Sequence, residues 1–194
     1  MSILDLSKSL MYDFHYNYIK TKYGDNAKLL FTDTDSLAYE IRTNDFYKDI
    51  NPYIEKLFDT SDYPTNHPSG IKTELNSKVL GMFKDEASGK QIVEFVGLRA
   101  KLTSYKMLDG SVDKKCKGVT KNVTKGNIQF DDYRECLISR KEQHRKMIVI
   151  RRHCYEIYTE EINKIALYSD DDKLVIMADG IHTKAHGHTN FKKM

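Results

Sequence analysis

The alternation of apolar and polar positions predicts a helix at the start of the chain. Within residues 2–23, Leu6, Leu10 and Phe14 recur at helical spacing. Gly24 follows this pattern, and glycine is a common residue just beyond the last helical turn. We therefore expect an amphipathic helix over residues 2–23 that ends at Gly24.

Two short apolar runs follow, at residues 28–31 and 36–41, with an acidic turn between them, and they predict a hairpin. Residues 45–58 have a helical pattern that Pro52 interrupts, and residues 59–70 have the composition of a loop. Further strands are expected at 79–83, 91–96, 100–108, 147–151 and 154–158, with a helix at 130–140. The pattern predicts an α+β protein.

Composition excludes several classes of protein. The chain has 194 residues, of which 40% are hydrophobic and 30% charged, a profile typical of one folded domain or two small ones. No apolar run approaches the roughly 20 residues of a membrane helix, and no signal peptide is visible at the start. We therefore expect an intracellular protein without a membrane partner. The three cysteines form no metal-binding or disulfide pattern. Cys116, set among lysines, is either a thiol of lowered pKa or a structural thiol.

The charge is unevenly distributed along the chain. Residues 1–113 carry a net charge of −3 and residues 153–194 a net charge of −2. Residues 114–152 carry 12 basic and 4 acidic side chains, a net charge of +8. Clustered lysines and arginines bind nucleic-acid phosphates by releasing counterions, although a solvated basic surface would have the same composition. The segment is a candidate surface for a polyanion.

The acidic turn is the most informative part of the sequence. Asp33 and Asp35 lie between strand-like apolar residues, where unneutralised carboxylates are unfavourable. If the chain were extended here, alternation would place both carboxylates on one face. Such a pair suits Mg²⁺, which prefers carboxylate oxygens together with water and phosphate. The alternative is a hairpin tip whose acids are simply solvated.

Two enzyme families have such a turn. In haloacid-dehalogenase phosphatases an apolar strand ends in Asp-x-Asp, which would make Asp33 the nucleophile and Asp35 the acid/base. Family B DNA polymerases have a Tyr-x-Asp-Thr-Asp-Ser hairpin in the palm. Residues 31–36 resemble that hairpin at every position except the first, where Phe31 replaces tyrosine.

The downstream sequence favours the polymerase. Residues 97–106 resemble the Lys-x-Tyr strand of protein-primed family B polymerases, and the lysine-rich residues 114–119 resemble the entry to their thumb. Thr103 stands where the family has tyrosine, and we expect Tyr105 on the same strand face as Lys101. The chain is most similar to the polymerases of Polinton or Maverick transposons and related viruses.

This resemblance implies a partial palm in residues 1–110, an antiparallel sheet with a packed helix and the acidic hairpin. It implies a small thumb and C-terminal tail in residues 111–194. Asp35 would bind Mg²⁺ directly and Asp33 would support a two-metal site. The partners would be a DNA primer–template, a dNTP and a terminal protein as primer, in the nucleus or a viral factory, with the oligomeric state left open. The implied DNA contacts are Arg99, Lys101, Tyr105, Lys114, Lys115, Lys117, Lys121 and Lys125.

The family's third metal-binding carboxylate, its fingers motif and its exonuclease acids are not found in the sequence. Residues 72–77 imitate part of the fingers motif, but they follow the hairpin instead of preceding it. We therefore expect the isolated chain not to polymerise DNA. Two alternatives remain open, a non-catalytic nucleic-acid-binding remnant of a mobile element and the phosphatase. His182, His186 and His188 are expected in a flexible tail rather than a metal site, and residues 170–172 in a surface turn.

Overall fold

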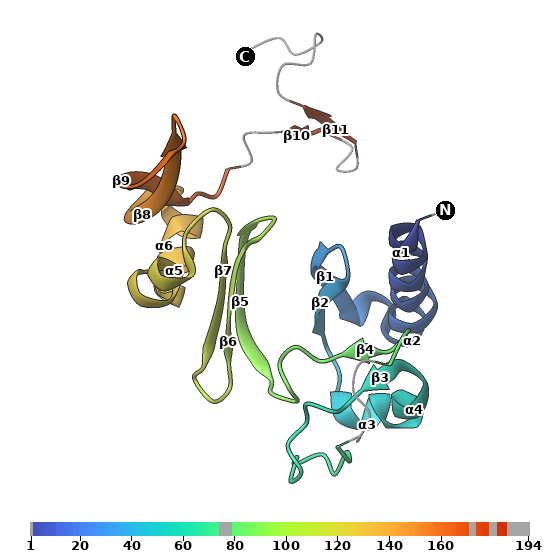
Figure 1. Ribbon diagram of the computed structural model, residues 1–194. Helices are drawn as coiled ribbons and strands as arrows, with labels where there is room; N and C mark the ends of the chain where they lie inside the picture. Colours follow the sequence, from blue (N-terminus) through green and yellow to red (C-terminus); the bar gives the residue numbers. More distant parts are fainter. Residues whose placement is uncertain (1, 74–78, 171–173, 179–181, 186–194) are drawn as a thin grey trace. The chain divides into compact units, whose positions relative to one another are not determined.

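The computed structural model describes residues 2–73, 79–170, 174–178 and 182–185, and it is a mixed α+β fold of small, mostly antiparallel sheets (Figure 1). It consists of two compact units. The first unit comprises residues 1–94 and 106–111, and the second comprises residues 95–105 and 112–194. The division of the chain into palm and thumb at residue 110 stays a prediction.

The first unit begins with the predicted helix. Its three consecutive parts are α1 (Ile3–Asp13), the π-helix Phe14–Lys20 and α2 (Thr21–Tyr23). A capping box between Ser2 and Asp5 satisfies backbone N–H groups at its start. Gly24 ends the helix with a φ of +53°, a conformation that glycine adopts without strain. The predicted helix and its end are confirmed.

The predicted hairpin is also confirmed. Strands β1 (Ala27–Asp33) and β2 (Ser36–Ile41) pair antiparallel, with a bulge between Leu29 and Phe31. The side of the hairpin that carries Leu37, Tyr39 and Ile41 packs against the helix core. Aromatic stacking contributes to that core, since the ring centroids of Phe14 and Phe83 lie 4.0 Å apart.

A short broken helix continues the first unit. It comprises α3 (Phe46–Ile50), the 3₁₀ turn Asn51–Tyr53 and α4 (Ile54–Leu57), so the interruption at Pro52 is confirmed. Strand β3 (Phe58–Asp59) pairs in parallel with β4 (Phe83–Lys84). The expected strand at 79–83 is therefore wrong except at its last residue. Gly81, with a φ of +87°, lies in a turn there instead.

A buried imidazole joins the two loops of the first unit. His67, only 8% exposed, hydrogen-bonds through Nε2 to the Gly89 carbonyl at 2.8 Å, and its Nδ1 accepts from the Ser69 backbone N–H at 3.2 Å. Because a backbone N–H can only donate, this is the neutral ring with its proton on Nε2. The Tyr47 hydroxyl donates to the same Gly89 carbonyl at 2.5 Å. The loops at 60–70 and 85–90 are held together at this point.

The second unit contains most of a three-stranded sheet. Its strands are β5 (Ile92–Arg99), β6 (Leu102–Met107) and β7 (Val112–Cys116), in that order across the sheet. The sequence predicted β5 and β6 approximately and did not predict β7. Strand β5 begins one residue and ends three residues later than expected, and β6 lies within the expected 100–108. Next to these strands, the Leu108 backbone N–H donates to the Gln91 carbonyl at 2.8 Å.

Two helices pack on this sheet. Helix α5 (Lys121–Asn127) was not expected, whereas α6 (Phe130–Ser139) confirms the helix predicted at 130–140. Asp132 accepts the Gln129 backbone N–H in a capping box, which fixes the start of α6. Tyr133 and Cys136 have no exposed surface. The core of the second unit consists of Val96, Leu98, Leu102, Ile128, Phe130, Tyr133, Cys136, Ala166 and Leu167.

A long hairpin follows α6. Strands β8 (Gln143–His153) and β9 (Glu156–Leu167) pair antiparallel, and their turn at Cys154 and Tyr155 has φ values of +45° and +69° (Figure 1). Two short strands were predicted, of which the second began at Cys154. Both strands are longer than predicted, because the pairing continues through polar and charged residues beyond the apolar runs. The last sheet is β10 (Leu174–Ile176) with β11 (Thr183–Ala185), antiparallel.

Candidate functional site

The acidic turn lies at the tip of the β1–β2 hairpin, in the first unit. Asp33 is the last residue of β1, pairs with Ser36 across the turn and is half-buried, whereas Asp35 is exposed. The Asp35 backbone N–H donates to the Asp33 carbonyl at 2.6 Å, and the Ser36 hydroxyl donates to the same carbonyl at 3.2 Å. The loop between the strands is thus closed by its own backbone.

Thr34 has a φ of +53°, which is unfavourable for a β-branched residue. The hydrogen bond from Asp35 to Asp33 spans this residue, as in a γ-turn, and γ-turns of positive φ are rare and strained. Because the chain reverses at Thr34, strand alternation does not determine on which face the two carboxylates lie. The sequence argument that alternation places both on one face is therefore wrong. Strain of this kind is concentrated at functional sites.

The described residues contain no group of three or more histidine, cysteine, aspartate or glutamate side chains positioned to hold a metal ion. The acidic turn therefore offers two carboxylates, Asp33 and Asp35, for a cation. Strand β1 pairs only with β2, and antiparallel, in the part of the chain that is described. The phosphatase requires Asp33 at the end of a central parallel strand, so the described sheet does not match that alternative.

The second unit holds the residues expected to contact DNA. Arg99 ends β5, and its guanidinium lies over the Tyr168 ring, 5.3 Å from the centroid. Lys101 is exposed in the turn before β6, with a φ of +62°, so the expectation that it shares a strand face with Tyr105 is wrong. Tyr105 itself is buried, with 8% of its surface exposed. Of these three, Lys101 is the most exposed.

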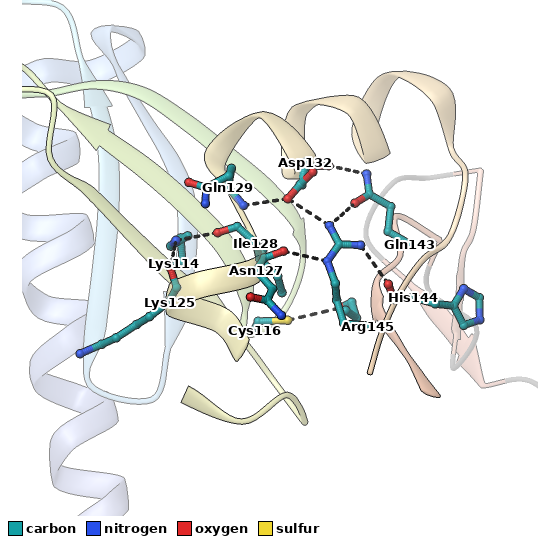
Figure 2. A network of polar contacts seen from close by, with 11 residues as sticks. Lys114, Cys116, Lys125, Asn127, Ile128, Gln129, Asp132, Gln143, His144 and Arg145 are labelled. Carbon is teal, nitrogen blue, oxygen red and sulfur yellow. Dashed lines mark hydrogen bonds and ion pairs between the residues drawn. The ribbon is translucent and has the colours of Figure 1, made fainter. Parts of the chain in front are cut away.

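The lysines of the basic segment divide into two groups. Lys114 donates its ammonium to the carbonyls of Lys125 and Ile128, at 3.1 and 2.6 Å, and so joins β7 to the end of α5 (Figure 2). Lys115 is half-buried on β7. Among the five lysines of the segment predicted to contact DNA, Lys117, Lys121 and Lys125 are exposed. Lys114 therefore has a structural role that the sequence did not indicate.

Arg145 is the centre of a polar network that the sequence analysis did not identify. Its Nε donates to the Asn127 carbonyl at 2.8 Å, and Nη2 lies 3.1 Å from the Asp132 carboxylate (Figure 2). Nη2 also donates to the Gln143 side chain at 3.1 Å, and Nη1 to the His144 carbonyl at 2.9 Å. This guanidinium connects α5, α6 and β8. In the sequence, Gln129 followed three residues later by Asp132 is a capping-box pattern. This pattern could have indicated the position of Asp132, the acidic residue of the network.

Burial raises the pKa of the Cys116 thiol, and contact with the Tyr133 hydroxyl and neighbouring positive charges only partly oppose that effect. Its Sγ lies 3.3 Å from the Ala166 carbonyl. Burial likewise raises the pKa of Tyr133, whose hydroxyl donates to the Lys115 carbonyl at 3.2 Å. The raised pKa is opposite to the lowered one expected for a reactive thiol and favours the alternative of a structural thiol.

A cavity of about 570 Å³ lies in the second unit at the base of the long hairpin. Arg99, His144 and Lys164 supply basic groups to it, and Glu142 an acidic one. Lys164 also donates to the Gly118 carbonyl at 2.9 Å. Asn163, Ile165 and Tyr168 complete the lining. Lys164 and Glu142 offset each other in formal charge, so Arg99, a predicted DNA contact, accounts for the cavity's net positive charge.

Other predictions fall partly outside the described residues. His182 is exposed beside β11, and Asp170 of the expected surface turn is exposed, while His186, His188 and residues 171–172 lie outside the described residues. No helix of the described chain is both long and apolar enough to cross a membrane. Comparison of the chain with protein-family models, with curated proteins and with solved structures finds no match in any of the three.

Proposed function

We propose that this chain is part of a DNA-directed DNA polymerase of the protein-primed family B type. In this proposal the acidic turn supplies Asp33 and Asp35 to a two-metal Mg²⁺ site, and the second unit holds the DNA primer–template. The observation that carries the proposal is the turn itself. An Asp-Thr-Asp-Ser sequence forms a strained reversal between two antiparallel strands, packed through β2 on a helix core.

The chemistry of the turn supports the metal-binding role. Two carboxylates at a hairpin tip can share cations whose other ligands are water and the phosphates of an incoming dNTP. In nucleotidyl transfer such ions activate the primer hydroxyl and stabilise the leaving pyrophosphate, while the protein positions the reactants. With two carboxylates only, cation binding by the isolated chain is expected to be weak, and primer extension is not expected.

The exposed lysines support the DNA-binding role. Lys117, Lys121 and Lys125 lie on the surface of the second unit, where they can contact phosphates without reading sequence. A nucleic-acid-binding remnant without a metal site would use the same lysines. The two functions differ in whether a metal bound at the acidic turn lies next to the primer end.

Iron-directed cleavage tests that difference. Fe²⁺ takes the place of Mg²⁺ at carboxylate sites, and with ascorbate it cuts nearby DNA. The intact chain bound to a labelled primer–template should produce cuts within a few nucleotides of the primer 3′ end. Asp33→Asn and Asp35→Asn should abolish these cuts, whereas Glu40→Gln, an exposed carboxylate on β2 of the same hairpin, should retain them.

Uniform cleavage along the duplex, or local cleavage that survives both aspartate substitutions, would favour the remnant over the polymerase. Primer extension is a second measurement. Incorporation of labelled dNTP by the isolated chain that is lost in Asp35→Asn would contradict the expected inactivity of this chain alone.

A further inference from the structure

We draw no further inference here: the strongest candidate, the outer face of the β8–β9 hairpin with the exposed side chains of Ile148, Ile150 and Ile157, carries none because nothing in the structure shows what covers it.

Discussion

The Arg145 network distinguishes positive charges that stabilise the fold from positive charges that are available to DNA. We predict that Arg145→Met destabilises the second unit strongly, although it removes only one of the chain's 31 basic lysine and arginine side chains. Methionine keeps most of the length of the side chain and loses every hydrogen bond. The Arg145 side chain is 22% exposed and the Asp132 side chain 25% exposed, so water replaces these contacts only in part.

The magnitude follows from what is lost. Arg145 donates to the carbonyls of Asn127 and His144 and to the Gln143 side chain, and it forms an ion pair with Asp132. Hydrogen bonds to charged groups contribute about 1.5–3 kcal/mol each when buried, and less with this exposure. Breaking a buried pair from one side costs about 3–5 kcal/mol. We expect a loss of about 3 kcal/mol in the free energy of unfolding of the second unit.

Hydrogen exchange measures this loss locally. Amides of α6 and β8 should exchange about a hundredfold faster in Arg145→Met, because every 1.4 kcal/mol corresponds to a factor of about ten. Arg134→Met removes the same charge from the exposed side of α6 and should change exchange by less than about 0.5 kcal/mol. Equal effects of the two substitutions would refute the reasoning. A double-mutant cycle with Asp132→Asn should show coupling between the two side chains.

Three further predictions concern packing and titration. Gly89→Ala places a Cβ 2.7 Å from the buried His67 imidazole, at a φ of +77°. Gly110→Ala has a similar φ of +82° but open space around the new Cβ. Urea unfolding should therefore show a loss in the free energy of unfolding about 2 kcal/mol larger for Gly89→Ala than for Gly110→Ala. Burial raises the pKa of Tyr39 from 10.0 to about 12, so the folded state keeps this hydroxyl protonated to a higher pH than the unfolded state does. The free energy of unfolding should therefore fall as the pH rises from 10 to 12. Absorbance at 295 nm should report ionisation near pH 12. At pH 8 a thiol reagent should modify the exposed Cys154 quickly and reach Cys116, whose pKa burial raises, only on unfolding.

Local signals in the sequence predicted several elements well. The helix before Gly24, the hairpin around the acidic turn and the helix after Gln129 each have a periodic apolar pattern together with a turn or capping residue. These elements depend on neighbours in the sequence. The strand expected at 79–83 lacked that agreement, because its apolar residues surround Gly81 in a turn.

The elements that the sequence did not predict depend on contacts between residues that are distant in the sequence. Strand β7 contains Asp113 and two lysines and has no apolar alternation, yet it pairs because β6 offers it an edge. The candidate site, like the fold, was predicted only in part. The acidic hairpin was visible in the sequence, but the reversal at Thr34 was not, since no residue there prefers a positive φ.

The basic segment shows why net charge overstates a DNA-binding surface. Lys114 and Arg145 belong to the +8 segment, but they are bound to carbonyls and to a carboxylate of the same unit. Of the five lysines of this segment that were predicted to contact DNA, Lys117, Lys121 and Lys125 are exposed.

Each phosphate contact contributes about −0.9 to the slope of log affinity against log salt concentration. Lys117, Lys121 and Lys125 should therefore together contribute roughly −3 to the slope for duplex DNA binding, and Lys121→Ala should reduce its magnitude by about 0.9. Lys114→Ala should leave the slope unchanged and destabilise the fold instead. A Lys114→Ala variant that binds with a reduced slope while its stability is unaltered would mean that this internally bound charge contacts DNA directly.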